Sequence, residues 1–328
     1  MTTIRDVAER AGVSTTTVSH VVNRTRKVDP RTAARVLTAI DELGYRPNAL
    51  ARSMRRGRTH TVGIVVPDIA NPFFGDLARS LEDHMFERDY SAIICNSDGD
   101  ATKEARYLDV LLSKKVDGLL LIAASHTHDG LGWLSRQGPP TIVVDRELDE
   151  PSVSQVMVEN RRGGYLAGRH LLELGHQDIA VIAGPGGLGT SARRLEGFRD
   201  ALTEAGVELP EARIFRGDFR AASGRVAMDG WIRQAPPPTA VFAENDLMAV
   251  GALSAAHAAG LEVPDDLSVV GFDGIAFGAD VTPPLTTVSQ STVDVAAAAI
   301  ELLFERLRYS LAAPRLVELA VALSVRGS

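Results

Sequence analysis

The 328-residue sequence predicts an α/β protein with a small N-terminal head of three helices and a core of two doubly wound parallel-sheet lobes. Two observations predict this fold class. From about residue 60 onward, apolar runs alternate with amphipathic helical patterns, which is typical of parallel sheets covered by helices on both faces. Residues 1–60 instead contain three short helical patterns, enough for one small core.

The charge is divided unevenly between these two parts. Residues 1–60 hold 12 Lys+Arg against 5 Asp+Glu, and residues 61–328 hold 23 against 37, within a net charge of -7. A basic head therefore precedes an acidic body, which suits a head that contacts phosphate. The alternative is a solvated N-terminal face.

The composition excludes membrane and secreted classes. No apolar run is long enough for a membrane span, and the N-terminus carries Asp6 and no apolar region typical of a signal peptide. The single cysteine, Cys95, cannot form an internal disulfide, which agrees with a reducing compartment. We therefore expect a cytoplasmic protein.

The head begins with a predicted helix-turn-helix. Apolar residues recur at helical spacing over residues 4–11, Gly12 ends that helix, and Ser14 is suited to cap the next one. A third helix begins after Pro30, and its inward face is predicted to include Leu37. The head is expected to comprise residues 1–46.

The second helix of such a motif lies in the major groove, where its N-terminal residues meet base edges. Here these residues are Thr15, Thr16 and Thr17, with His20 one turn later. Threonine offers a hydroxyl and a methyl group, and histidine can bond purine acceptors. Because Ser and Thr are also common at helix starts as caps, the helical pattern alone leaves both interpretations open.

The body, residues 60–328, contains two series of predicted strands. They are residues 61–66, 92–96, 116–123 and 141–144, then 179–183, 213–216, 240–243 and 267–272. Amphipathic helical patterns separate them, at residues 74–88, 103–114, 162–174, 193–205 and 247–259. We expect one lobe from about 60–159 plus 290–312, and a second from about 160–289 plus 313–328.

Ligands of open parallel sheets bind beyond the carboxyl ends of the strands. Polar or aromatic residues at such positions are Asn71, Phe73, Phe74, Asp145, Arg146, Asn160, Arg194, Phe219, Asn245, Asp246, Asp273 and Gln290. Carboxylates and arginines can pair with sugar hydroxyls, and an aromatic face can stack on a sugar ring. Any one of them alone would be interpreted as a loop residue whose polar group is hydrogen-bonded within the protein, but their recurrence at strand ends predicts a ligand-binding cleft.

The head resembles that of the lac-repressor (LacI) family of transcriptional regulators, and its sequence is most similar to those of the ribose and purine repressors. The matching runs are Ile4-Arg5-Asp6-Val7-Ala8, Ala11-Gly12-Val13-Ser14, Thr17-Val18-Ser19-His20-Val21-Val22-Asn23 and Gly44-Tyr45-Arg46-Pro47-Asn48-Ala49-Leu50-Ala51-Arg52-Ser53. The resemblance implies operator DNA as a partner, base contacts from Thr15, Thr16 and His20, and further DNA contacts from Thr17 and Asn23.

The same resemblance implies a hinge helix and linker at residues 47–59, with Arg52 and Arg55 contacting phosphate or the minor groove. The family usually places a leucine wedge between base steps at the operator centre, and this sequence has Met54 there. Methionine is apolar and flexible, so we expect the kink to survive.

The body resembles the periplasmic-binding-protein-like core of the family. The matching runs include Val116-Asp117-Gly118, Gly163-Gly164-Tyr165-Leu166-Ala167-Gly168, Arg194-Leu195-Glu196-Gly197-Phe198, Gly271-Phe272-Asp273 and Pro283-Pro284-Leu285-Thr286-Thr287-Val288. The cleft residues given above, Asp246 excepted, match ribose-binding proteins, which implies ribose, a pentose, as the effector. A purine-type regulator that needs a corepressor is the alternative, and a sugar-binding transport receptor is a weaker one.

Other motifs are set aside. Gly184, Gly186 and Gly189 form a literal G-x-G-x-x-G, but a lone match is a weak sign of a nucleotide cofactor, and we expect no cofactor. His126 and His128 lack further ligands at metal-binding spacing, so no metal is expected. No nucleophile with its base is evident, so the protein is not expected to be an enzyme. The chain ends at Ser328 without leucine heptads, and a dimer is expected.

Overall fold

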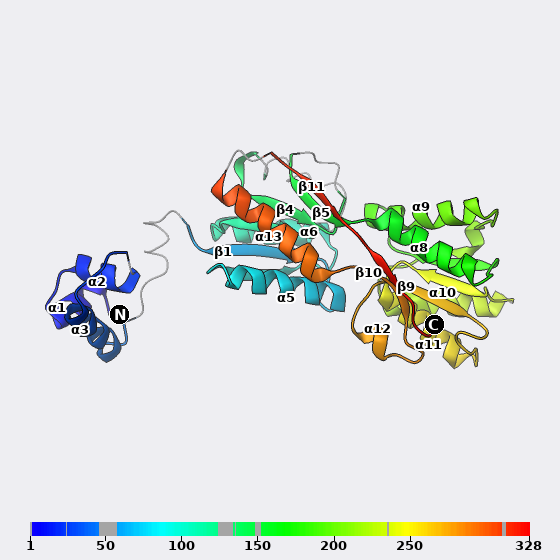
Figure 1. Ribbon diagram of the computed structural model, residues 1–328, viewed down its shortest axis with the longest axis horizontal. Coiled ribbons are helices and arrows are strands. Elements are labelled where there is room, and N and C mark those ends of the chain that lie inside the picture. The colour runs from blue at the N-terminus through cyan, green and yellow to red at the C-terminus, as the bar shows by residue number, and fades with distance from the viewer. Residues whose placement is uncertain are drawn as a thin grey trace. The chain divides into compact units, whose positions relative to one another are not determined.

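The computed structural model describes residues 2–23, 25–45, 58–123, 134, 136–147, 152–234, 236–309 and 313–328. The chain divides into two compact units, Met1–Thr59 and His60–Ser328 (Figure 1). Among the described residues, no helix is both long and apolar enough to cross a bilayer.

The described part of the first unit is a helical head that contains α1 Ile4–Ala11, α2 Thr15–Asn23 and α3 Pro30–Glu42. Thr3 and Asp6 form a reciprocal capping box at the start of α1, and Gly12 ends that helix in the left-handed conformation. Ser14 Oγ accepts the Thr17 backbone N–H at 3.1 Å, as its predicted capping role requires. The prediction that Leu37 faces inward is wrong: 57% of it is exposed, because Val36 and Ala39 are the residues of α3 that fill the core.

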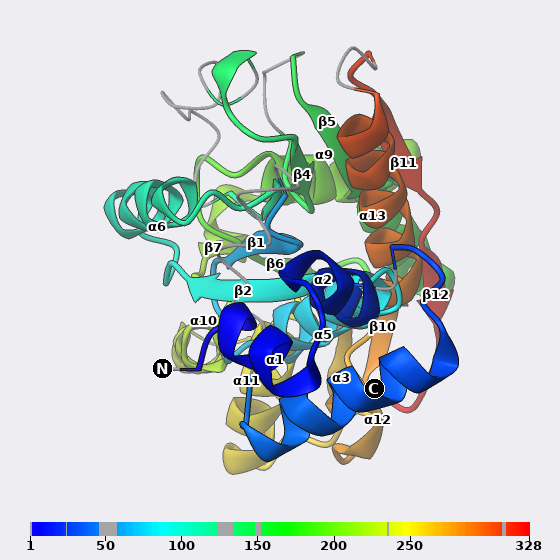
Figure 2. The same ribbon diagram turned by 90° about the vertical axis from the view of Figure 1, so that its left-hand side faces the viewer.

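The N-lobe of the second unit is a six-stranded parallel sheet of order β11-β5-β4-β3-β1-β2. Its strands are β1 Thr61–Val66, β2 Ser91–Asn96, β3 Gly118–Leu121, β4 Thr141–Val144, β5 Ser154–Val158 and β11 Leu316–Leu319. Among the residues that the structure describes, the helices that cover it are α5 Pro72–Phe86, α6 Ala101–Ser113 and α13 Thr292–Arg308. Ile64 packs in the core beneath α5 and α13, and its neighbour Val65 packs with α6, so α6 and α13 cover opposite faces (Figure 2).

The C-lobe sheet has the order β12-β10-β9-β8-β6-β7, in which only β12 is antiparallel to its neighbour. Its strands are β6 Ile179–Ala183, β7 Ile214–Arg216, β8 Ala240–Ala243, β9 Ser268–Asp273, β10 Thr286–Ser289 and β12 Ala322–Ser324. Its helices are α8 Asn160–Glu173, α9 Gly189–Glu204, α10 Ala221–Gln234, α11 Asp246–Ala258 and the short α12 Phe277–Asp280, with a 3-10 turn at Glu211–Arg213. One face packs on α8 and α9, and the other on α10 and α11.

The C-terminal segment corrects one sequence prediction. Residues 313–328 were assigned to the C-lobe, but β11 pairs with β5 of the N-lobe, and only β12 joins the C-lobe sheet (Figure 1). The physical reason is that Val317 and Leu319 pack against the N-lobe core, while Leu323 packs against the C-lobe core. The segment therefore links the two lobes, as do the connections from β5 to α8 and from β10 to α13.

Two pairs of C-lobe helices cross at backbone contact distance. A Cβ atom on Gly164 of α8 would lie 1.9 Å from the Arg194 carbonyl oxygen, and one on Gly197 of α9 would lie 1.8 Å from the Arg161 carbonyl oxygen. Gly224 and Gly251 play the same part where α10 crosses α11. Only glycine permits these approaches, and the first of them fixes α8 against the helix that carries Arg194.

Candidate functional site

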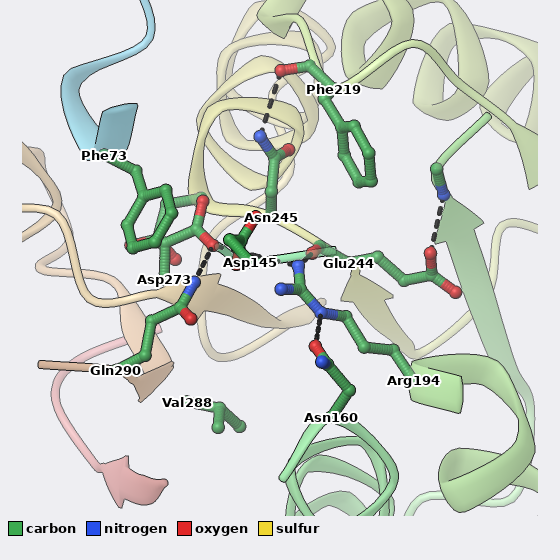
Figure 3. A network of polar contacts seen from close by, with 12 residues as sticks. Phe73, Asp145, Asn160, Arg194, Phe219, Glu244, Asn245, Asp273, Val288 and Gln290 are labelled. Carbon is green, nitrogen blue, oxygen red and sulfur yellow. Dashed lines mark hydrogen bonds and ion pairs between the residues drawn. The ribbon is translucent and has the colours of Figure 1, made fainter. Parts of the chain in front are cut away.

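A pocket lies where the carboxyl ends of the strands of both lobes meet, as the rule for parallel sheets requires. Its cavity volume is only about 20 Å³, far below the usual range for ligand pockets, so the lining side chains nearly fill it. Its lining residues are Asn71, Phe73, Phe74, Asp145, Arg146, Thr190, Arg194, Phe219, Asn245 and Asp273. Nine of them were predicted from the sequence, and Thr190 was not. Figure 3 shows the rings of Phe73 and Phe219 on either side of the polar groups.

The N-lobe contributes a buried ion pair at the end of β4. Arg146 Nη1 lies 2.5 Å from Asp145 Oδ2, and both side chains are almost fully buried. Arg146 Nε also donates to the Ala123 carbonyl at 3.1 Å, and its guanidinium lies 5.4 Å from the Phe74 ring centroid. Burial raises the pKa of Asp145, and the charges of Arg146 and Arg194 oppose that rise.

The C-lobe contributes Arg194, which α9 presents to the pocket. Its Nε donates to Asn160 Oδ1 at 2.9 Å, and its Nη1 donates to the Glu244 carbonyl at 2.5 Å (Figure 3). The guanidinium also lies 3.6 Å from the Phe272 ring centroid. Asn160 was predicted to contact ligand, but it does not line the pocket. Its Nδ2 donates to the Val158 carbonyl at 3.1 Å, and its Oδ1 accepts from Arg194, which it orients.

Asp273, the last residue of β9, is the second buried carboxylate of the pocket. Arg194 Nη1 lies 3.7 Å from its Oδ1, and Gln290 Nε2 donates to the same oxygen at 2.8 Å. Burial raises the pKa of Asp273 well above its ordinary value, and the nearby Asp246 and Asp145 add to the rise that Arg194 opposes. Gln290, like Asn160, was predicted to line the pocket and instead lies behind a lining residue.

Three lining residues adopt left-handed backbone conformations, with φ of 55° at Asp145, 65° at Phe219 and 116° at Asp273. Such conformations cost about 1–3 kcal/mol each and persist only where the surrounding structure enforces them. Asn245 shows how this is done, since its Nδ2 donates to the Phe219 carbonyl at 3.0 Å and its Oδ1 accepts from the Met248 backbone N–H at 3.0 Å. The fold therefore holds a fixed set of groups around the pocket.

Three buried polar atoms in this region have no hydrogen-bond partner among the described residues. They are Thr190 Oγ1, in the pocket wall, and Glu244 Oε1 and Gln290 Oε1, which lie behind it. A buried polar atom left without a partner costs about 1–3 kcal/mol, so Thr190 offers free hydrogen-bonding capacity to a ligand. The sequence analysis did not single out Thr190, which lies in the first turn of α9, one turn before Arg194.

The G-x-G-x-x-G run belongs to the same wall. A Cβ atom on Gly184 would lie 2.2 Å from the Phe219 ring, and Gly189 begins α9. Close packing against the Phe219 ring therefore accounts for the glycine at residue 184.

The head presents the predicted DNA-reading residues on one helix. Thr15 and Thr16 are exposed at the start of α2, whereas Thr17 is half-buried against Ser14. His20 Nδ1 lies 2.8 Å from Thr25 Oγ1, and Asn23 Nδ2 donates to the Ser19 carbonyl at 2.8 Å. Arg52, Met54, Arg55 and the hinge at residues 47–59, apart from its last two residues, lie outside the described residues.

Comparison with known proteins adds a second line of evidence. A family model described as bacterial regulatory proteins, lacI family, matches residues 3–48, and one described as a periplasmic binding protein-like domain matches residues 169–328. The HTH-type transcriptional repressor PurR of Photobacterium profundum is 38% identical over 329 residues, covering 100% of this chain and 98% of that protein. The chain belongs to the lacI family of bacterial regulatory proteins. It is a DNA-binding repressor, and the predicted fold class is confirmed.

Two solved structures of the family bear on its binding partners. The lac repressor dimer bound to operator and the anti-inducer ONPF is 28% identical, with a TM-score of 0.90 over 99% of this chain and 98% of that chain. A lacI-family regulator from Enterococcus faecium with bound ribose is 33% identical, with a TM-score of 0.74 over 82% of this chain and 98% of that chain. The family binds operator DNA and a small-molecule effector, while the roles assigned above to single residues stay predictions.

Proposed function

We propose that this lacI-family repressor acts in the cytoplasm as a dimer on a pseudopalindromic operator, and that a monosaccharide, with ribose as the first choice, binds its cleft and releases it. The protein is then a ligand-controlled switch and not an enzyme. The observation that carries the choice of a sugar is the polarity of the pocket, since seven of its ten lining residues are polar.

A sugar and a purine base make different demands on such a pocket. A pyranose or furanose carries hydroxyls around its whole ring, and each hydroxyl both donates and accepts. A purine offers hydrogen-bonding atoms only at the edge of a flat ring. The two ion pairs, Asp145 with Arg146 and Arg194 with Asp273, place donors and acceptors in both lobes, which favours a ligand with hydroxyls on several sides.

The purine-type alternative is favoured by a different observation, the similarity of the whole chain to repressors named PurR. A purine-type regulator would bind its operator only when its ligand is bound. The two candidates therefore predict opposite signs, because a ligand strengthens whichever state it binds better.

Titration calorimetry with ribose and with hypoxanthine, each with and without operator duplex, tests both candidates. We expect ribose to bind, and operator to weaken ribose binding by the same factor by which ribose weakens operator binding. Gel shifts supply the second factor. Binding of hypoxanthine that strengthens the operator complex, with no response to any pentose, would replace the sugar by a purine corepressor.

Cleft closure has a structural basis in ion pairs that join the two lobes. Arg193 on α9 of the C-lobe donates from Nη2 and Nε to both carboxylate oxygens of Glu147 in the N-lobe, at 3.0 and 3.1 Å. Arg220 Nε of the C-lobe lies 3.6 Å from Asp68 Oδ2 of the N-lobe. Because these contacts exist only when the lobes are together, they favour the arrangement that encloses the ligand.

We therefore expect Glu147→Gln to weaken effector affinity about 2- to 5-fold, the value of a partly exposed ion pair, and to reduce its dependence on salt. Glu211→Gln is the matched control, because Glu211 pairs with Arg199 at 2.8 Å within the C-lobe. Calorimetry at two salt concentrations measures both. Equal salt dependence in the two variants would count against a role for the Glu147 pair in closure.

A further inference from the structure

Glu244 is a buried carboxylate that lies next to the pocket without lining it. It follows β8, it is 0% exposed, and its side chain leads away from Asp145 and Asp273 (Figure 3). Its Oε2 accepts the Gly184 backbone N–H at 2.7 Å and the Ser191 hydroxyl. These partners are 60 and 53 residues away in the sequence, so Glu244 joins β8 to both ends of the segment 184–191.

The segment 184–191 forms one wall of the effector pocket. Gly184 packs on the Phe219 ring, and Thr190 carries the buried hydroxyl that lacks a partner among the described residues. Arg194 follows one turn later on α9 and donates to the Glu244 carbonyl. The carboxylate of Glu244 therefore holds the two ends of this wall, Gly184 beside Phe219 and Ser191 beside Thr190, while its backbone carbonyl accepts from Arg194.

A carboxylate is a costly group at this position. Its Oε1 has no partner among the described residues, and a glutamine would have nearly the same shape without a buried charge. The charged groups that act on it are Arg194 from α9 and Arg216 at the end of β7, and both favour the ionised form. Burial outweighs them and raises the pKa of Glu244 to about 7, so the group titrates near neutrality.

We propose that Glu244 is a positioning residue that fixes the 184–191 wall when it is ionised, and that effector affinity therefore rises as the pH increases through neutrality. The ionised carboxylate is the stronger acceptor for the Gly184 N–H and the Ser191 hydroxyl, because charge-assisted hydrogen bonds are about twice as strong as neutral ones. Protonation loosens the wall and with it the place of Thr190. The inference rests on the proposed function only in using the effector as a reporter.

The isosteric variant Glu244→Gln tests the proposal. At low pH we expect the wild type and the variant to bind ribose with equal affinity. From about pH 6 to pH 8 the ratio of the wild-type affinity to the variant affinity should rise about 3- to 10-fold. Burial also raises the pKa of Asp145 and of Asp273, but both residues remain in the two proteins, so the ratio of the two affinities isolates Glu244. An unchanged ratio across this range would overturn the proposal.

A second variant tests the hydrogen bond itself. Ser191→Ala removes a donor that lowers the pKa of Glu244, so the midpoint of the affinity change should move to higher pH while the change persists. A midpoint that stays in place, or a pH response that disappears with Ser191, would contradict the assignment to Glu244.

A measurement without ligand separates this proposal from the choice of effector. Amide hydrogen exchange of residues 184–191 should be faster in Glu244→Gln than in the wild type at pH 8, and equal in the two proteins at pH 6. Equal exchange at both values would overturn the proposal even if ribose binds. A difference at pH 8 with no binding of ribose or hypoxanthine would keep the role of Glu244 and reject the proposed effectors.

Discussion

Arg146→Ala is expected to weaken effector binding by about 100-fold or more and to leave operator binding by the effector-free protein intact. The variant removes a charged donor from the pocket wall, worth about 1.5–3 kcal/mol, and the packing of its guanidinium on Phe74. It also leaves the buried Asp145 without its counterion. Calorimetry with ribose and gel shifts with operator measure the two effects separately.

Removing Arg146 should also lower the free energy of unfolding, because Asp145 loses its counterion. Breaking a buried ion pair by removing one partner costs about 3–5 kcal/mol when the other partner stays charged. Burial already raises the pKa of Asp145, so that carboxyl can take up a proton, and the cost should lie below that range at low pH and increase with pH. Thermal unfolding of the variant between acid and neutral pH checks this direction.

Two further variants make the Arg146 result interpretable. Arg146→Lys keeps the charge but loses the planar fork, and it should bind effector with intermediate affinity. Arg162→Ala makes the same change at an exposed position on α8, and it should leave both activities unchanged. Loss of operator binding by Arg146→Ala, with effector affinity intact, would contradict the assignment of Arg146 to the effector site.

The strands that the sequence predicted well are those buried on both faces. Thr61–Val66 and Thr141–Val144 are uninterrupted apolar runs, and their predicted and observed bounds coincide. β5 begins with Ser154 and Gln155, and β11 alternates between exposed and half-buried residues, so neither forms a continuous apolar run. β5 pairs with β4, and β11 pairs with β5 across about 160 residues, a long-range pairing that local patterns do not encode.

The candidate site, like the strands, was predicted where local patterns suffice and missed where it depends on contacts between distant segments. The sequence analysis found nine lining residues, because most of them end or closely follow a strand that the sequence reveals; Arg194 lies further on, within α9. It also placed Asn160 and Gln290 in the lining, where the structure uses them to orient Arg194 and Asp273. Which polar residue touches the cavity and which lies behind it depends on side-chain packing between elements far apart in the sequence.

Gly164→Ala is expected to lower the melting temperature by about 6–12 °C, corresponding to a loss of about 3 kcal/mol. The added Cβ would lie 1.9 Å from the Arg194 carbonyl oxygen, and that oxygen is backbone, so the conflict is relieved only if α8 and α9 separate. The two helices carry Asn160 and Arg194, whose bond of 2.9 Å spans the crossing, and effector affinity should therefore fall as well.

Gly230→Ala is the matched control for this prediction. Gly230 also lies within a helix, α10, but a Cβ there would meet no atom within 4 Å. Replacing a helical glycine by alanine in open space stabilises a protein by about 0.5–1 kcal/mol, so this variant should melt slightly higher than the wild type, with unchanged effector affinity. Opposite shifts of the two variants would establish that close approach of α8 to α9, and not glycine content, sets the geometry of Arg194. A melting temperature for Gly164→Ala equal to that of the wild type would mean that the helices can separate at little cost.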